Sequence, residues 1–286
     1  MFCVYCGTQL PDDANFCLKC GKSLKAIMPT IGPKFETREV VLTLAPNVTL
    51  DLVSVPAGEF LMGSTDADEY ARGDEKPQHK VTLSDYLIGR YEVTNAQYGL
   101  FARTRRAGLL SGGKVNDPNW SMPSGKENHP VVQVSWDDAL AFCAWASQVT
   151  GLNVKLPTEA QWEKAARGTD GRIFPWGNEA LDKTRANVGT SGTTPVGSFS
   201  PGDSPYGLAD MAGNVWQWTA DWYSDTYYAS SPASNPQGPT TGEFRVMRGG
   251  GWNYLFSARA AYRWVGPSGR LDRGGFRVVV ASTPVS

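Results

Sequence analysis

Two stretches early in the chain have the apolar and polar pattern of β-strands. Residues 40–44 (VVLTL) are a run of β-type residues, and residues 48–55 (VTLDLVSV) alternate with the period of a strand. The segment 56–64 (PAGEFLMGS) is expected to end a further strand in a turn, and 74–81 (DEKPQHKV) leads into another. The beginning of the large folded region is therefore predicted to be mainly β-structure.

Three later segments have the start signals of helices. Thr94, Ser135 and Thr158 each precede a helical stretch and are suitable N-caps. Asp138 and Gln161 stand three residues after the second and third caps, which is the spacing of a capping box. We therefore predict helices from Thr94 to about residue 105, from Ser135 to near residue 151, and from Thr158 onward.

The C-terminal segment 244–280 follows neither a helical nor a strand period. Its glycine-rich ends, 248–252 (RGGGW) and 274–278 (GGFRV), enclose many large apolar side chains. Trp252 and Phe276 in these ends are expected to be rigid core residues. The part between the ends is predicted to be a surface loop, and large apolar side chains on a surface usually contact another molecule.

Composition limits the class of protein. The 286 residues include 31 glycines, 19 prolines and 10 tryptophans, which favours an irregular, loop-rich domain over a helical bundle. A net charge of -1 gives no electrostatic reason to expect nucleic acid or an anionic membrane as a partner. We find no apolar run long enough to span a bilayer and no signal-peptide pattern at MFCVYCG, so the default expectation is a cytoplasmic protein. Nothing in the composition indicates the oligomeric state.

Four cysteines at the N-terminus have the spacing of a closed zinc site. Cys3, Cys6, Cys17 and Cys20 form two C-x2-C pairs, and two such turns complete a tetrahedral thiolate site. The alternative is two disulfides, which would suit a secreted protein. This stretch resembles the short zinc ribbons of many bacterial and archaeal proteins. We therefore predict a ribbon at 1–25 with structural zinc, a linker at 26–38 and a large domain at 39–286.

Several motifs of the large domain resemble one known family. They are 91–98 (YEVTNAQY), 129–136 (HPVVQVSW), 156–163 (LPTEAQWE), 174–178 (FPWGN) and 206–218 (YGLADMAGNVWQW). In this order they are similar to the formylglycine-generating-enzyme, or sulfatase-modifying-factor, family over about residues 53–280. The resemblance implies one α+β domain with the C-type-lectin-like fold, which is loop-rich and has small twisted sheets and two or more helices.

The residues that active family members use for catalysis are missing. Those members bind copper with two cysteines shortly after the motif that matches 248–252, but no cysteine follows Cys143 here. Cys143 lies on a predicted helix rich in Ala, Phe and Trp and is expected to be a core thiol. His79 and His129 are too few for an iron site, and no Gly-x-Ser-x-Gly elbow is present. We therefore expect that the chain is not an enzyme.

The C-terminal segment is similar to one subset of this family, the variable proteins of prokaryotic and viral diversity-generating retroelements. In that group the residues between the two glycine-rich ends are diversified and face a ligand. By resemblance Arg259, Ala261, Arg263, Pro267 and Arg270 are the fixed frame. The implied ligand-facing positions are Asn253, Tyr254, Leu255, Phe256, Tyr262, Trp264, Val265, Ser268, Leu271 and Asp272.

The resemblance thus implies a non-enzymatic protein that binds an unknown protein or other macromolecule through a diversified surface. Tyrosine and tryptophan suit such a surface because they give rigid contact area at little entropic cost. Two alternatives remain: an oxidase of the formylglycine-generating type that uses unrecognised residues, and an adaptor with one fixed protein partner. Seven arginines and one carboxylate, Asp272, lie between Arg245 and Arg277, so some arginines need partners elsewhere.

The resemblance also implies a structural calcium site. The ligands would be Asp210, the carbonyl groups of Gly213 and Val215, and the side chain of Gln217. Oxygen ligands of these types suit calcium. Gln217 stands where the family has glutamate, which removes a charge and weakens the site.

Overall fold

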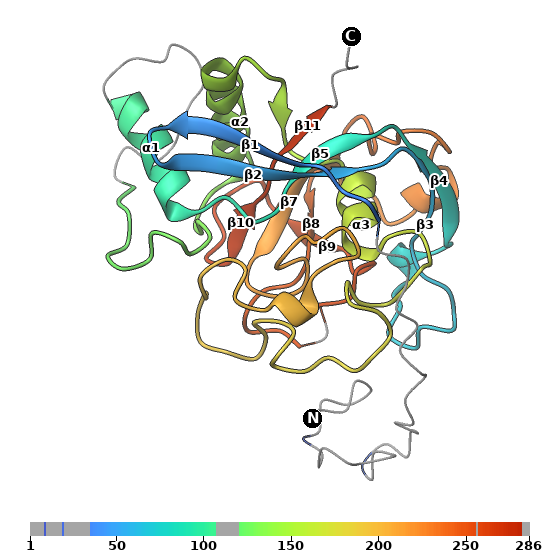
Figure 1. The fold of residues 1–286 in the computed structure, drawn as a ribbon. Coiled ribbons are helices and arrows are strands. Elements are labelled where there is room, and N and C mark those ends of the chain that lie inside the picture. The colour runs from blue at the N-terminus through green and yellow to red at the C-terminus, as the bar shows by residue number, and fades with distance from the viewer. Residues whose placement is uncertain (1–8, 10–18, 20–34, 107–119, 256, 282–286) are drawn as a thin grey trace.

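The computed structural model describes residues 9, 19, 35–106, 120–255 and 257–281 (Figure 1). The four cysteines of the predicted ribbon lie outside the described residues, as does Phe256. In the described part, most of the chain is loop between short elements. The helices are α1 (Asn95–Arg106), α2 (Trp136–Thr150) and α3 (Glu159–Arg167).

Three small sheets carry the strands of the described part. The first has the order β1 (Glu39–Ala45), β2 (Val48–Val55), β5 (Tyr86–Gly89), β11 (Val279–Ala281) and β6 (Val154–Lys155). The second has the order β10 (Gly274–Phe276), β7 (Trp216–Trp222), β8 (Arg245–Arg248) and β9 (Trp264–Gly266). The third pairs β3 (Gly58–Met62) with β4 (His79–Leu83).

The first two strands form the hairpin that their alternating pattern predicts. β1 and β2 are antiparallel, and Leu42 lies opposite Leu50. β2 then pairs with β5, and β5 pairs with β11 from the far end of the chain. The C-terminal segment is thereby fixed to the first sheet by main-chain hydrogen bonds.

The predicted helix starts are confirmed by their cap geometry. The Ser135 side chain accepts from the amide of Asp138, and the Asp138 side chain accepts from the amide of Ser135. Thr158 and Gln161 form the same reciprocal box at α3. Gly151 is the C-cap of helix α2, and its φ of 71° lies in the left-handed region that favours glycine.

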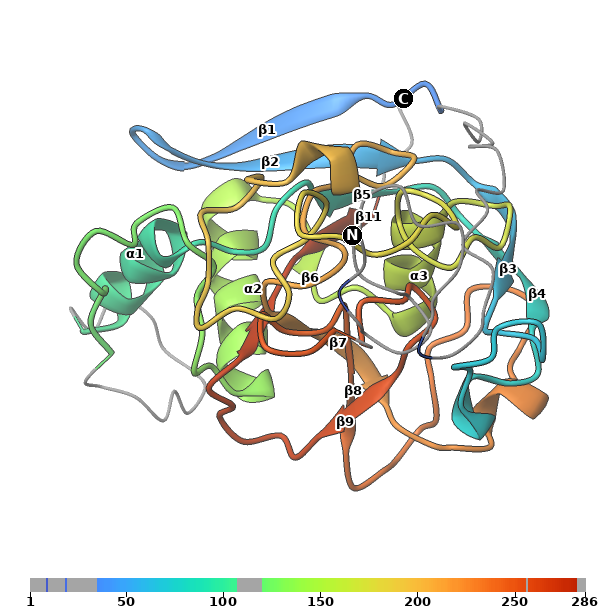
Figure 2. The ribbon, with the colours of Figure 1, turned by 90° about the horizontal axis from the view of Figure 1, so that it is seen from below.

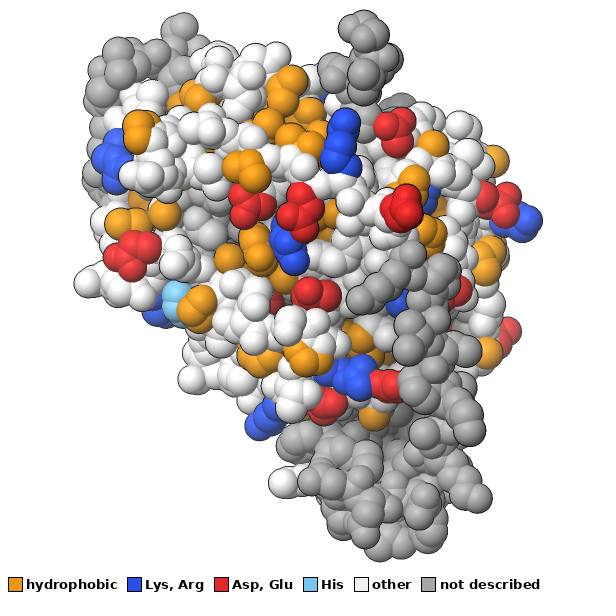
Figure 3. Space-filling model, viewed as in Figure 1, with side chains coloured by type: hydrophobic (Ala, Val, Ile, Leu, Met, Phe, Trp, Pro, Cys, Tyr) orange, Lys and Arg blue, Asp and Glu red, His pale blue; other side chains and the backbone are white. Residues whose placement is uncertain are grey.

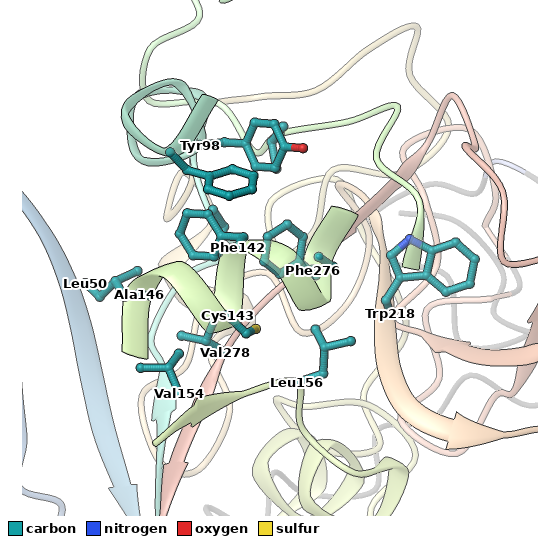
Figure 4. Close-up of a cluster of buried hydrophobic side chains, with 14 of the residues drawn as sticks. Leu50, Tyr98, Phe142, Cys143, Ala146, Val154, Leu156, Trp218, Phe276 and Val278 are labelled. Atoms are coloured by element: carbon teal, nitrogen blue, oxygen red, sulfur yellow. The ribbon is translucent and has the colours of Figure 1, made fainter. Parts of the chain in front are cut away.

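One large apolar core joins the hairpin to the helices α1 and α2. Figure 4 shows Tyr98, Phe142 and Phe276 around its centre, and the ring centroids of Phe142 and Phe276 are 5.3 Å apart. Cys143 is buried among these residues, and burial raises the pKa of its thiol. The expectation of a core thiol at this position is therefore confirmed.

A second core cluster surrounds α3 and lies toward β3 and β4. Both ribbon views place α1 and α2 at one end of the molecule and β3 with β4 at the other (Figures 1 and 2). Figure 2 shows the β1–β2 hairpin on one side and β8 and β9 on the opposite side. None of the helices in the described ranges is both long and apolar enough to cross a membrane.

The C-terminal segment contains more regular secondary structure than its sequence predicts. The sequence predicts loop between the two glycine-rich ends, but residues 264–266 form β9, which pairs with β8. A three-residue strand is too short to give a period in the sequence. The described residues on either side of β9, at 249–255, 257–263 and 267–273, match the predicted loop.

Candidate surface for ligand binding

Two buried carboxylates of α3 hold two arginines of the C-terminal segment. Arg248 donates to Glu159 at 2.8 Å and to Glu163 at 2.6 Å, and Arg263 donates from Nε to Glu159 at 2.7 Å. All four residues are buried. An arginine without such partners would suffer a large desolvation penalty, so these pairs fix the backbone on both sides of the intervening loop.

Arg259 has a separate set of partners in the loop before β4. Its two terminal nitrogens donate to the two carboxylate oxygens of Glu75, both at 2.7 Å, and one of them also reaches Asp68 at 2.7 Å. A bidentate pair of this kind fixes the guanidinium plane as well as its position. The loop at 257–263 is therefore fixed to two distant parts of the chain, α3 and the segment 68–75.

Arg277 lies in a third buried network. Its Nε donates to the side-chain oxygen of Gln217 at 2.7 Å, and its terminal nitrogens donate to the carbonyls of Gly89 and Ala209. Burial lowers the pKa of Arg277 to about 10. Glu92 is also buried there, and burial together with the nearby Asp210 raises the pKa of its carboxyl group. We call Arg248, Arg259, Arg263 and Arg277 the arginine frame.

The predicted ligand-facing positions lie outside this frame. The described ones are all half-buried or exposed, and Tyr254 is 50% exposed. We call this set the display surface; its members are Asn253, Tyr254, Leu255, Tyr262, Trp264, Val265, Ser268, Leu271 and Asp272. Between them Arg259, Ala261 and Arg263 are buried, as expected of fixed residues.

Some expected frame residues are placed differently. Pro267 is exposed, and Arg270 is half-buried with an ion pair to Asp138 at 3.0 Å. Trp252, an expected core residue, is only half-buried, whereas Phe276 is fully buried. Trp252 follows a turn at Gly249 and Gly250, both of which have a positive φ, whereas Phe276 lies on β10 beside β7.

Aromatic rings form the centre of the display surface. The Trp216 ring, at the start of β7, supports Trp264 at a centroid distance of 4.8 Å and Tyr262 at 5.9 Å. Arg72 lies over the Tyr262 ring at 5.6 Å, and Arg273 lies over the Tyr254 ring at 5.4 Å. The sequence reasoning missed Trp216 and Arg72, because their contacts with the C-terminal segment span long sequence separations and leave no local pattern. It counted Arg273 only as one of the seven arginines of the segment.

Two of the four predicted calcium ligands, Gln217 and Asp210, have other hydrogen-bond partners in the structure. The Gln217 side-chain oxygen accepts from Arg277 Nε and from Trp162 Nε1, both at 2.7 Å. The cation that this oxygen contacts is therefore the guanidinium group of Arg277. One Asp210 carboxylate oxygen accepts from the amide of Gly197 at 2.7 Å. Among the described residues no group of three or more His, Cys, Asp or Glu is arranged to hold a metal. The amide side chain of Gln217 thus accepts a hydrogen bond from Arg277.

The histidines have structural contacts. His129 Nδ1 lies 2.9 Å from Thr193 Oγ1, and His79 Nδ1 lies 3.0 Å from the Pro77 carbonyl. On the face shown in Figure 3, acidic and basic side chains are interspersed with apolar ones.

Two family models match parts of this chain. Residues 39–282 match the model of the sulfatase-modifying factor enzyme 1-like domain, and residues 2–24 match a zinc-ribbon domain. A protein of Thermomonospora curvata named formylglycine-generating enzyme is 35% identical over 79% of this chain and 92% of its own length. Its namesake in Streptomyces coelicolor is 34% identical over 81% of this chain and 90% of its own length. A bovine relative named inactive C-alpha-formylglycine-generating enzyme 2 is 30% identical over 74% of this chain and 79% of its own length.

Two solved structures have the same fold. PvdO from Pseudomonas aeruginosa has a TM-score of 0.70 and 30% identity, covering 85% of this chain and 98% of its own. Treponema denticola variable protein 1 has a TM-score of 0.67 and 25% identity, covering 85% of this chain and 99% of its own. The expected α+β class with small sheets and a C-type-lectin-like fold is confirmed.

One expectation is overturned by these relatives. The missing copper-binding cysteine pair leads to the expectation that the chain is not an enzyme, yet proteins 34–35% identical across most of it are named as enzymes. The expectation is wrong because a missing ligand pair excludes one way of binding copper. It does not remove the chain from an enzyme family, whose fold can place other residues at the same surface.

Proposed function

The chain belongs to the family of the sulfatase-modifying factor enzyme 1-like domain, and on this scaffold we propose that the display surface binds a macromolecular ligand. The surface combines aromatic residues with the exposed or half-buried Arg72 and Arg273. Tyrosine, tryptophan and arginine are the residues that most often dominate binding energy at protein interfaces. We infer that the ligand is a protein or another large molecule with a complementary surface.

The observation that carries the proposal is the division of roles within one segment. In the stretch 257–263 the buried side chains enter the frame or the core, while Tyr262 points to the surface between two buried neighbours. Ion pairs with α3 and with the loop 68–75 keep the backbone in place. A surface held in this way can change its most exposed side chains, such as Tyr254, at little cost to the fold and loses little entropy on binding.

Selection from a random peptide library tests the proposal although the natural ligand is unidentified. The library, displayed on phage, would be panned on the full-length chain, and enriched peptides would be measured against Tyr254→Ser and Trp264→Ala. We expect both variants to weaken binding at least tenfold. Val41→Ser is the matched control, because Val41 is 61% exposed on β1. Peptides that bind all variants equally, or no enrichment at all, would contradict the proposal.

We further propose that the display surface is of the diversified kind, as the resemblance to retroelement variable proteins and the fold of the Treponema denticola protein support. The alternative is an adaptor with one fixed partner. A genome sequence separates the two: a diversified protein has a reverse transcriptase gene and a near-copy of the segment 245–280 beside its own gene. A locus without both supports the adaptor.

The second candidate function is the activity for which the relatives are named. Identity of 34–35% over most of the chain favours this activity. Against it, no cysteine follows Cys143, so the C-terminal segment offers no thiol for the oxidation. Incubation with copper, oxygen and a sulfatase-type peptide that contains cysteine tests it by mass spectrometry. Conversion of the cysteine to formylglycine above a protein-free control establishes the activity, and its absence leaves binding as the function of this surface.

For the N-terminal ribbon we propose one structural zinc held by Cys3, Cys6, Cys17 and Cys20. The match of residues 2–24 to a zinc-ribbon domain and the two C-x2-C pairs support it. A segment this short gains most of its folding free energy from the metal. We expect one zinc per purified chain, and its loss in the double variant Cys17→Ser, Cys20→Ser, with cooperative unfolding of the large domain retained. Retention of a full equivalent in that variant would refute the assignment.

A further inference from the structure

A buried hydrogen-bond donor without a partner lies beneath the display surface. Trp216 is 3% exposed, and its Nε1 contacts no acceptor among the described residues. An indole N–H is donor-only, and buried donors in native proteins nearly always find an acceptor. The ring lies against Tyr262 and Trp264, which belong to the display surface. The orphaned donor thus points to an acceptor that arrives from outside the chain.

The buried Gly251 packs closely against the pyrrole edge of Trp216. A Cβ placed on Gly251 would lie 3.3 Å from Trp216 Nε1 and 3.7 Å from Cβ of Arg273. The donor, the glycine and a cationic residue therefore meet at one place. Arg273 stacks over Tyr254 and makes no ion pair within the described ranges. Its positive charge remains available to a ligand.

The charges around this place favour an anion. Arg72, which lies over the Tyr262 ring, has a half-exposed side chain and contacts Asp74 at 3.3 Å and the Tyr262 hydroxyl at 3.2 Å. A guanidinium has five N–H donors, so most of them stay open. The exposed carboxylate nearby, Asp272, accepts from Gln133 at 3.4 Å. Two arginines that lie over rings of an aromatic centre suit a ligand carboxylate, which pairs well with guanidinium groups.

We infer that the display surface recognises a carboxylate-bearing side chain of a protein ligand, with Trp216 Nε1 and Arg273 as its contacts. The inference rests on the proposed binding function and names the chemistry of its ligand. Nε1 is covered in the free chain, so the carboxylate reaches it only after the groups packed around Gly251 move apart. One carboxylate oxygen then accepts from the indole N–H, and the other pairs with the guanidinium.

The test uses nuclear magnetic resonance of the full-length 15N-labelled chain, with glutamate blocked at both ends as the probe. The indole signal of Trp216 is assigned by its loss in Trp216→Phe or, where that variant does not fold, by its proximity to the Gly251 amide. We expect this signal to shift saturably with blocked glutamate and at least tenfold more weakly with blocked glutamine. The same titration in Arg273→Gln should need at least tenfold more ligand.

Two further variants sharpen the result. Arg90→Gln is the matched control, because Arg90 also stacks on a tyrosine, Tyr91, at 5.8 Å but lies outside the display surface; its titration should equal that of the original chain. Gly251→Ser places a hydroxyl beside Nε1 and should abolish the shift. The inference is overturned if the Trp216 signal does not move, if blocked glutamine acts equally well, or if Arg273→Gln changes nothing.

The carboxylate of a sugar is the rival source, and N-acetylneuraminate is the probe for it. Tighter binding of this sugar than of blocked glutamate would overturn the assignment to a protein ligand. Failure of the carboxylate test remains distinct from failure of the binding function. Selected peptides that depend on Tyr254 and Trp264, together with no glutamate effect at Trp216, would leave the binding surface in place and remove only its proposed chemistry.

Discussion

Arginines of the same segment serve two opposite purposes in this protein. Arg248 and Arg263 are buried and bonded to the carboxylates of α3, whereas Arg273 is half-buried, lies over Tyr254 and makes no ion pair within the described ranges. The difference comes from what lies opposite each one: carboxylates from distant segments, or an aromatic ring at the surface. The residue type alone therefore does not tell a frame position from a binding position.

The strongest test of this difference is to neutralise one buried, paired arginine and one arginine at the surface. Arg248→Met keeps most of the side-chain volume but leaves Glu159 and Glu163 buried with less positive charge. Breaking a buried pair by removing one partner costs about 3–5 kcal/mol, so we expect a loss of that size in the free energy of unfolding. Arg273→Met should change it by about 0.5 kcal/mol or less. Urea unfolding of both variants measures the contrast, and equal losses would erase the distinction.

A second contrast compares aromatic residues at two depths. Phe276 is fully buried, so Phe276→Ala should cost about 3–5 kcal/mol. Tyr262 and Trp264 are half-buried and pack on the edge of the main core, so truncation of either to Ala should cost about 1–3 kcal/mol. These two rings therefore contribute to the packing of the core as well as to the display surface. Thermal melts of the three variants decide it, and a loss at Trp264 as large as at Phe276 would assign the display surface to the core.

How much of this arrangement the sequence predicts depends on the range of the contacts. The caps at Ser135 and Thr158 and the β1–β2 hairpin are local, and each is predicted from a few neighbouring residues. The partners of Arg259 lie about 190 residues away, and no local pattern marks them. The display surface is predicted by resemblance, while Arg72 and Trp216, which complete it, come from other parts of the chain.

The pH dependence of stability tests the buried network around Arg277, the third network of the arginine frame. Burial raises the pKa of Asp210 to about 6, above its ordinary value of 3.8. Between these two values the folded chain binds more protons than the unfolded chain, so this carboxyl stabilises the fold at low pH and loses that contribution as the pH rises toward 6. Asp210→Asn keeps an acceptor for the Gly197 amide and does not ionise.

We therefore expect Asp210→Asn to gain stability relative to the original chain as the pH rises from 4 to 7, by on the order of 1–3 kcal/mol. Urea unfolding at intervals of half a pH unit measures this difference. Groups that do not interact with Asp210 cancel in this difference. The pKa of Glu92 is raised by burial and also by Asp210, so it falls in the variant and adds to the expected gain. A difference that stays constant over this range would show that Asp210 titrates at its ordinary value in the fold.

The smallest effect is expected at the most exposed ring. Tyr254 is 50% exposed and lies beneath Arg273, so Tyr254→Ser removes one stacking contact and little buried area. Surface changes of this kind usually stay within about 0.5 kcal/mol, and a surface cation–π contact is worth about 0.5–1 kcal/mol, so the melting temperature should hardly move. Binding of selected peptides should fall at least tenfold in the same variant. A change that barely affects folding but strongly affects binding is what separates a display position from a frame position, and a large drop in stability at Tyr254 would remove that separation.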